Sequence, residues 1–199
     1  MDHALPECLT LGRLATPIGE ALIVTDEEGR LCALDWSDFE SRLLRTIRRH
    51  HGPATTLNPG PVPRRIVAAV EAYFSGHLTS LEGLPCRTGG TPFQREVWEA
   101  LRKIPVGRTL SYSALAARIG RPKAVRAVGL ANGANPIGVV VPCHRVIGAN
   151  GTLTGYGGGL HRKRWLLAHE GVPMDEQPTL PIWQGYGAPP SAARGPIWQ

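Results

Sequence analysis

The chain has few cysteines, no long apolar segment and no secretion signal, and each shortage argues against a class of protein. Its four cysteines in 199 residues include no C-x-x-C pair, which argues against a zinc site and against a disulfide-rich secreted protein. No stretch approaches the ~20 apolar residues of a membrane span, and the first residues lack a signal peptide's charged-then-apolar pattern. We therefore expect a cytoplasmic protein with no metal, no other cofactor and no membrane partner.

Acidic residues are also in the minority. The chain has 22 Lys and Arg against 16 Asp and Glu, a formal net charge of +6 and a pI near 9.5. A basic balance suits a polyanionic partner, although a solvated basic face is the alternative. Many cations share one half of the sequence with Cys143, namely Arg102, Lys103, Arg108, Arg118, Arg121, Lys123, Arg126, Arg145, Arg162, Lys163 and Arg164.

The first 88 residues have the pattern of a small α/β domain. Three short apolar stretches bounded by turn residues predict strands over 9–14, 21–25 and 31–36. Helical periodicity predicts helices over 39–50 and 64–74. We expect no chemistry from this part alone, and residues 87–90 predict a linker to a second domain over 89–172.

The second domain opens with a clear helix start. Thr91 is a predicted N-cap, Pro92 occupies the first helical position and Gln94 completes a capping box. Two further helices, over 113–119 and 122–132, are joined by a tight turn at Gly120 and predict a helix-turn-helix. Because helical cores also contain such pairs, this pattern alone does not assign DNA binding. A last helix is predicted from 160 to Gly171.

A cysteine lies between a proline and a histidine in the segment Val141-Pro-Cys-His-Arg-Val146. The apolar run 137–141 before it predicts a buried strand that delivers Cys143 and His144 to the edge of the core. A thiol attacks as thiolate, and we expect the imidazole and the cationic Arg145 to lower its pKa from ~8.5. The alternative is a buried structural cysteine beside an unrelated histidine.

Six blocks of sequence, in order and in register, resemble one family. They are Tyr112, Arg126-Ala-Val-Gly129, Asn135-Pro136, Pro142-Cys-His-Arg-Val146, Gly155-Tyr-Gly-Gly-Gly159 and Leu166-Leu-Ala-His-Glu170. The chain resembles the 6-O-alkylguanine-DNA alkyltransferases, nearly unbroken from Thr91 to Gly171 and more weakly over 9–87. The resemblance implies an α+β fold, in which a three-strand, ribonuclease-H-like α/β domain precedes a helical domain with the helix-turn-helix.

The resemblance also implies a reaction and the residues that perform it. Cys143 takes the alkyl group from 6-O-alkylguanine in DNA, and also from 4-O-alkylthymine, in a single turnover. His144 receives the thiol proton through a water, and Glu170 holds and charges His144. Asn135 braces the active-site turn, and Tyr112 contacts the flipped base.

The implied partner is double-stranded DNA with a flipped alkylated guanine. The second helix of the helix-turn-helix enters the minor groove, where small side chains allow close approach. Arg126 fills the space that the base leaves in the stack. The helix residues expected at the DNA are Lys123, Ala124, Arg126 and Ala127.

The implied base pocket includes main-chain groups of Cys143 and Val146 and the loop with Tyr156, Gly157 and Gly158. Gly157 stands where other members of the family carry serine, and Gly138 where some carry proline. Both differences predict a more mobile loop and a roomier pocket, so the preferred size of the alkyl group stays open.

Three other classes of protein remain as alternatives. A non-catalytic alkyl-damage-binding protein would have the same fold without the reactive cysteine, which Cys143 argues against. A cysteine hydrolase would need an oxyanion hole, and only the glycine-rich loop suggests one. A transcription regulator would use the helix-turn-helix, but no additional regulatory domain is predicted.

The final segment, 173–199, is rich in proline and glycine, which predicts disorder in isolation. Within it, Gln177–Ile182 resembles the Gln-x-x-Leu-Pro-aliphatic peptides by which bacterial repair proteins bind the replication sliding clamp. The alternatives are that the tail packs its tryptophans on its own domain or has no role. We expect a monomer.

Overall fold

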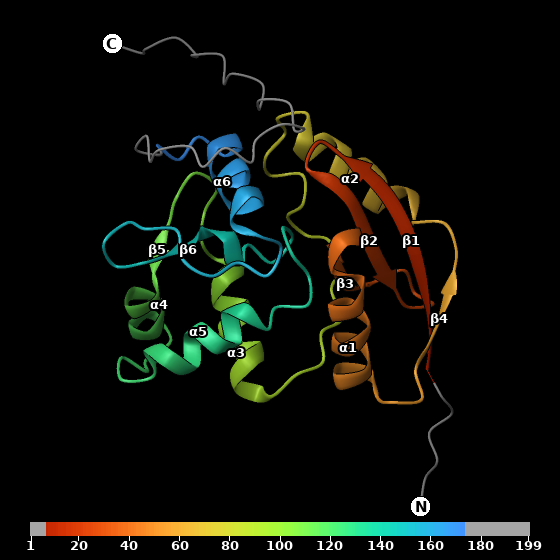
Figure 1. Cartoon of the computed structure of the whole chain (residues 1–199), viewed down its shortest axis with the longest axis horizontal. Coiled ribbons are helices and arrows are strands. Elements are labelled where there is room, and N and C mark those ends of the chain that lie inside the picture. Colours follow the sequence, from red (N-terminus) through yellow and green to blue (C-terminus); the bar gives the residue numbers. More distant parts are fainter. Residues whose placement is uncertain (1–6, 174–199) are drawn as a thin grey trace, which may run out of the picture.

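The computed structural model describes residues 7–173 (Figure 1), so Gln177–Ile182 and almost all of the predicted tail lie outside the described residues. The N-terminal part is a sheet with strand order β3-β2-β1-β4. Its antiparallel strands are β1 (Cys8–Thr16), β2 (Gly19–Thr25) and β3 (Leu31–Trp36), and β4 (Thr56–Pro59) runs parallel to β1. The sequence predicts three strands because β4 is short, mostly exposed and ends in proline, without an alternating apolar pattern.

Alternating side chains of the sheet contact different helices. Leu22 and Val24 of β2 pack in one cluster with Leu43 of α1 (Glu40–His51). Ile23 points the other way and joins the larger core, to which α2 (Arg64–Phe74) contributes Tyr73. The period of two along β2 therefore places one helix on each face of the sheet.

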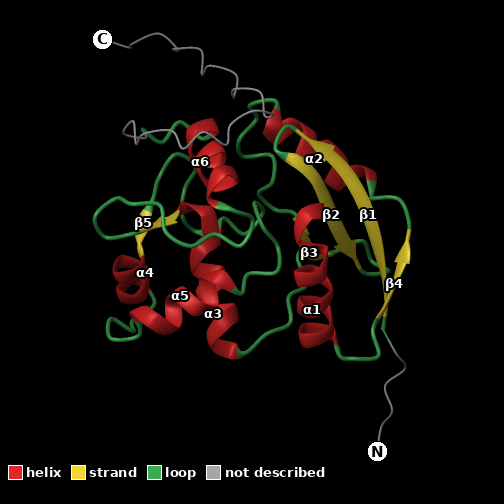
Figure 2. Cartoon of the chain, in the orientation of Figure 1, coloured by secondary structure: helices red, strands yellow, loops and turns green. Residues whose placement is uncertain are grey.

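The C-terminal part is mainly helical (Figure 2). A two-stranded sheet, β5 (Leu110–Ser111) and β6 (Val146–Ile147), lies among four helices. These are α3 (Pro92–Arg102), α4 (Tyr112–Arg118), α5 (Val125–Gly133) and α6 (Leu160–His169).

The sequence signals locate two of these helices with different accuracy. The capping box of α3 is present, because the Gln94 amide donates to Thr91 Oγ1 at 3.2 Å and the Thr91 amide to Gln94 Oε1 at 2.9 Å. In contrast, α5 begins three residues later than its predicted start at 122. The residues before it form a turn, closed by the Ala124 amide donating to the Arg121 carbonyl at 2.9 Å.

The two parts share one apolar core and one stretch of backbone pairing. Tyr73 of α2 and Trp98 of α3 belong to the same buried cluster as Cys143. At the free edge of β3, the Leu34 amide donates to the Pro136 carbonyl, and the Gly138 amide donates to the Leu34 carbonyl, both at 2.9 Å. The sheet of the N-terminal part thus holds the segment that leads to Cys143. Within residues 7–173, no helix is long and apolar enough to cross a membrane.

Candidate active site

The segment before Cys143 is a tight turn, so the predicted strand over 137–141 is wrong. The Val140 amide donates to Gly138 O at 2.7 Å and the Val141 amide to Ile137 O at 3.0 Å. Val139 has φ 67°, which is costly for a β-branched residue. The run is apolar because the turn is buried in the core, and burial alone does not distinguish a strand from a turn.

The side chain of Asn135 holds this turn and contacts the thiol. Its Nδ2 donates to Val141 O at 2.8 Å and to Cys143 Sγ at 3.0 Å, while its Oδ1 accepts from the Ile137 amide at 3.1 Å. A single amide group therefore fixes both ends of the turn and the position of the sulfur. The expected proximity of Asn135 to Cys143 is present.

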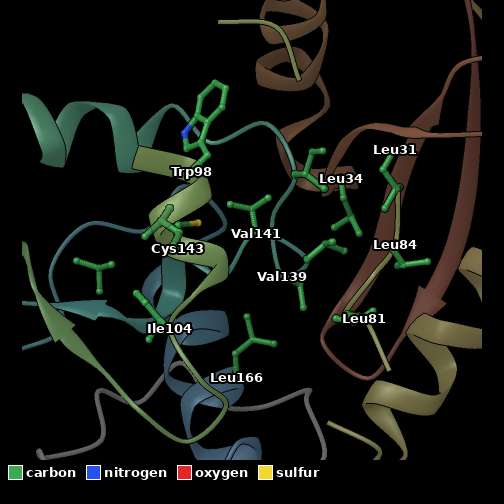
Figure 3. Close-up of a cluster of buried hydrophobic side chains, with 14 of the residues drawn as sticks. Leu31, Leu34, Leu81, Leu84, Trp98, Ile104, Val139, Val141, Cys143 and Leu166 are labelled. Atoms are coloured by element: carbon green, nitrogen blue, oxygen red, sulfur yellow. The ribbon is translucent and has the colours of Figure 1, made fainter. Parts of the chain in front are cut away.

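Cys143 begins a short 3-10 helix, η2 (Cys143–Arg145), and its side chain lies in the apolar core (Figure 3). Burial raises the pKa of its thiol, although the hydrogen bond from Asn135 and the charge of Lys163 act in the opposite direction. The thiol therefore rests protonated. The expectation that Arg145 lowers this pKa is wrong, because the guanidinium of Arg145 points to Glu170 instead.

His144 and Glu170 form a fully buried pair, as expected. Nε2 of His144 lies 2.9 Å from Glu170 Oε1, and the Nδ1 atom is buried with no hydrogen-bond partner among the described residues. Burial lowers the pKa of His144, and the charge of Glu170 offsets this only in part. Burial alone would raise the pKa of Glu170, but His144 and Arg145 outweigh it and hold the pKa well below its usual range. The carboxylate thus accepts a hydrogen bond from the protonated Nε2, which leaves Nδ1 with a free lone pair.

Arg145 neutralises the carboxylate of Glu170 from the other side. Its Nε donates to Glu170 Oε2 at 2.8 Å, its Nη2 to Oε1 at 2.8 Å and its Nη1 to Ile104 O at 2.6 Å. This bidentate pair offsets the charge of Glu170 before His144 takes up any proton. The expectation that Glu170 charges His144 is therefore wrong for the resting state, because burial lowers the pKa of His144 more than Glu170 raises it and the imidazole stays neutral.

Lys163 is a buried cation that the sequence analysis does not assign to the site. Its ammonium donates to Val146 O at 2.6 Å and to Thr154 O at 2.8 Å, which joins β6 to the loop after it. Burial lowers its pKa to about 8, and the nearby Cys143 acts against this shift. The available signal was a lysine close to the apolar residues Trp165 and Leu166 in the predicted last helix.

A cavity reaches Cys143 between the two parts of the chain. Tyr156, Gly157 and Gly158 line it as expected, together with Trp36 and Arg42 of the N-terminal part. Val146 is fully buried and is not among the lining residues. Its carbonyl, like the Cys143 amide that donates to Val141 O at 2.8 Å, already has a partner.

The roomier pocket and more mobile loop stay predictions, and the structure shows the pocket with the loop packed against it. The cavity has a volume of only about 50 Å³. Arg42 donates to the Gly157 carbonyl, and a Cβ atom at Gly157 would lie 2.8 Å from Arg42 Nη1. Arg162 donates to the Gly158 carbonyl at 3.0 Å. The small glycines therefore allow Arg42 and Arg162 to pack closely against the loop.

The residues expected at the DNA lie on the helix-turn-helix. Lys123, Arg126 and Ala127 are exposed, Ala124 is half-buried, and Arg126 makes no ion pair within residues 7–173. Leu130, one turn after Arg126 on the same face of α5, is 71% exposed. This surface is basic and has little side-chain bulk.

Tyr112 links the helix-turn-helix to the loop of the pocket. At the start of α4, its hydroxyl donates to the Thr154 carbonyl at 3.3 Å, beside Gly155. Its ring lies near Gly129 of α5, where a Cβ atom would be 3.8 Å from the ring. Tyr112 therefore lies between the exposed helix and the pocket.

Two family models match nearly the whole described chain. The model "6-O-methylguanine DNA methyltransferase, ribonuclease-like domain" matches residues 10–88, and "6-O-methylguanine DNA methyltransferase, DNA binding domain" matches residues 92–172. These matches confirm the predicted resemblance and the α+β fold class.

Curated relatives and solved structures agree with the family models. The methylated-DNA–protein-cysteine methyltransferase of Salmonella typhimurium is 53% identical over 80% of this chain and 94% of its own length. That of Haemophilus influenzae is 40% identical over 82% of this chain and 87% of its own. Mycobacterium tuberculosis OGT in complex with DNA superposes with a TM-score of 0.70 at 43% identity, covering 81% of this chain and 92% of that one.

Proposed function

The chain belongs to the 6-O-methylguanine DNA methyltransferase family, and from this premise we propose that it repairs DNA by moving the alkyl group of 6-O-alkylguanine onto Cys143. The observation that carries the residue assignment is the environment of this thiol. Cys143 lines a cavity, accepts a hydrogen bond from Asn135 and precedes a histidine that is paired with a buried carboxylate.

The reaction is a direct displacement at the alkyl carbon. The sulfur of Cys143 forms a bond to this carbon, the bond from the carbon to O6 breaks, and the electron pair stays on guanine, which takes up a proton. The thiol proton passes through a water to Nδ1 of His144, whose buried, unpartnered lone pair supports this path. Glu170 holds the imidazole through Nε2 so that Nδ1 remains the basic atom.

The protonation states at rest support a concerted use of the thiol and the base. Burial keeps the Cys143 thiol protonated and His144 neutral, so the thiolate forms when a base and an alkylated substrate are both present. Asn135 and Lys163 stabilise the developing charge on sulfur. Because the product is a thioether with no good leaving group, water does not regenerate the thiol, and each molecule reacts once.

The alkylated base enters the pocket by leaving the DNA stack. A cavity of about 50 Å³ is far below the ~300 Å³ of a small ligand pocket, so the Tyr156–Gly158 loop opens first. Arg126, exposed and unpaired within the described chain, fills the vacated space in the stack. Tyr112 contacts the flipped guanine and its phosphate.

The helix α5 enters the minor groove and binds without reading a sequence. The exposed face of α5 carries Arg126, the small Ala127 and Leu130, and Lys123 and Ala124 lie just before the helix. These residues include no series of side chains suited to the edges of successive bases. Binding should therefore depend strongly on salt and little on undamaged sequence. A footprint with one preferred undamaged sequence would favour a transcription regulator instead.

The stack-filling role of Arg126 can be separated from a role in the fold. Replacing Arg126 by alanine should slow repair of duplex DNA far more than reaction with a free alkylated guanine, because the free base needs no extrusion. Equal losses on both substrates would mean that Arg126 supports the protein itself.

We also propose that the protein acts as a monomer in the cytoplasm and that Gln177–Ile182 binds the sliding clamp. Such an interaction would place a single-use protein near replicating DNA, where the lesion mispairs. A labelled peptide of residues 177–184 titrated with purified clamp tests this. The absence of saturable binding, or binding unchanged when Gln177 and Leu180 become alanine, would contradict it.

Mass spectrometry tests the main proposal and its alternative. After incubation with methylated duplex DNA, the intact protein should gain one methyl group, located on Cys143, and release no free base. A protein that binds the damaged DNA but stays unmodified would instead be an alkyl-damage-binding protein.

A further inference from the structure

Tyr73, the penultimate residue of α2, makes two hydrogen bonds to the end of α6. Its phenol Oη donates to Glu170 Oε1 at 2.8 Å, and its backbone carbonyl accepts from Nε2 of His169 at 2.7 Å. The side chain is fully buried, so neither contact competes with water. A residue of the N-terminal part thus contacts both the carboxylate behind His144 and the residue next to it.

The hydrogen bonds to Glu170 show why this contact is distinctive. Oε1 accepts from Tyr73 Oη at 2.8 Å, from His144 Nε2 at 2.9 Å and from Arg145 Nη2 at 2.8 Å. His144 and Arg145 both belong to η2, the short helix that also carries the thiol. Tyr73 is the donor to Glu170 that comes from outside the C-terminal part.

We propose that Tyr73 is a positioning residue of the alkyl transfer reaction, through which the N-terminal part fixes Glu170 and sets the basicity of His144. The inference rests on the proposed function for its kinetic consequence. Without the phenol, Glu170 would be oriented only by the two residues that it is supposed to hold. We predicted no chemistry from the N-terminal part alone, and this proposal gives its helix α2 a contact with the proton relay of the C-terminal part.

Tyr73 and His144 both donate to Oε1 of Glu170, and this shared oxygen sets the direction in which the phenol shifts the pKa of His144. A phenol that donates to Oε1 withdraws negative charge from the carboxylate, so less remains to attract a proton on His144. The other titratable groups facing this pair are Arg145 of η2 and Lys163 and His169 of α6, with Cys143 and Tyr156 nearby. None of these is changed by removing the Tyr73 hydroxyl, so a shift in the His144 titration reports this hydrogen bond.

The test replaces Tyr73 by phenylalanine in the full chain and compares it with a packing control. Tyr73→Phe keeps the edge-to-face ring contacts with Phe74 and His169 and keeps the backbone carbonyl. The limiting single-turnover rate with methylated DNA should fall by about tenfold, as expected for a hydrogen bond to a charged group, with unchanged DNA affinity. The acid limb of the rate and the His144 pKa, followed by nitrogen NMR, should both move to higher pH.

The control is Phe74→Leu, which loosens the same end of α2 against Trp165 without touching Glu170. It should lower the melting temperature and leave the rate of the folded protein and the His144 titration unchanged. If Tyr73→Phe behaves in the same way, Tyr73 is merely structural and the proposal is wrong. If it does not fold, 3-fluorotyrosine placed at residue 73 keeps the shape and strengthens the donor, and it should move the His144 pKa downward; no movement would overturn the proposal.

Different results would contradict the proposed function and the positioning role of Tyr73. A wild-type protein that leaves Cys143 unmodified by methylated DNA would contradict the proposed function. The His144 titration in Tyr73→Phe needs no alkyl transfer, so it still decides whether Tyr73 acts on the relay.

Discussion

Two buried cysteines of this chain lie in opposite settings, and their comparison shows what makes a thiol reactive here. Cys32 is on β3 in the cluster under α1, and burial, with a contribution from Asp26, raises its pKa to about 12. Burial also raises the pKa of Cys143, but Asn135 and Lys163 counteract it. Cys32 has only a long contact to Arg30 O, at 3.8 Å. Burial is common to both, and the difference lies in what surrounds the sulfur.

The surroundings differ because of the backbone that carries each residue. Cys32 lies on the edge strand β3 at a β-bulge opposite Val24 and Thr25, and its side chain packs in the apolar cluster with Leu43 of α1, so its sulfur has little but apolar contacts. Cys143 follows a turn whose geometry depends on the side chain of Asn135, and the cavity opens onto it. The turn brings a donor, a base and space for substrate to one sulfur.

The largest expected effect is the loss of the thiol itself. Cys143→Ala should abolish alkyl transfer, because no other group can take the alkyl carbon. DNA affinity should stay within a few-fold of wild type, since contacts to phosphates supply most of it. A transfer assay with radiolabelled methyl groups and a binding titration measure the two quantities. Methyl groups still moving to the mutant protein would show that another residue is the acceptor.

The next largest effect should come from the base. His144→Ala should slow transfer near pH 7 by about a thousandfold, within the range for general base catalysis. Burial lowers the pKa of His144, so the imidazole stays deprotonated to lower pH. The wild-type rate should therefore stay constant as the pH falls from 7 to below about 6.5. The rate of the variant should instead rise with pH into the alkaline range, toward the raised pKa of the thiol.

A half-buried histidine provides the control for this prediction. Burial also lowers the pKa of His50, which packs near Trp98 and has no carboxylate partner within residues 7–173. His50→Ala should leave the rate and its pH profile unchanged. A flat pH profile for His144→Ala would argue against the proton path through His144.

The hydrogen bond to sulfur should account for a smaller loss. Asn135→Ala removes a donor to the developing thiolate and loosens the turn, so transfer should slow by about a hundredfold. A matched variant exists in the sheet, where Asn58 Nδ2 donates to Cys8 Sγ at 3.1 Å. Asn58→Ala should leave the rate unchanged. Similar rates for both variants would mean that the Asn135 contact does not assist the reaction.

The smallest effect should be seen at Cys32. Cys32→Ala should leave alkyl transfer unchanged and lower the free energy of unfolding by about 1 kcal/mol, because a small cavity remains under α1. Urea denaturation and the transfer assay together check this. A large loss of transfer with unchanged stability would show that the two thiols are coupled.

Local sequence signals predicted much of the fold. The apolar period and the proline before it placed α2 over its observed range, and the Thr91 capping box fixed the start of α3. The same reasoning failed for β4 and for the segment 137–141, where the pattern is short and apolar without alternation. A run of that kind becomes a strand or a buried turn according to what packs around it.

The sequence predicted which residues carry the chemistry, and the fold brought some of them together and turned others toward different partners. The Pro-Cys-His-Arg segment and the blocks in register with it identified the thiol, the imidazole and Glu170. Only the fold turned Arg145 away from its neighbour Cys143 toward Glu170, 25 residues later, and placed Tyr73 on the same carboxylate. The reason is physical: sequence patterns report local backbone preferences, whereas the partner of a buried charge depends on packing between distant elements.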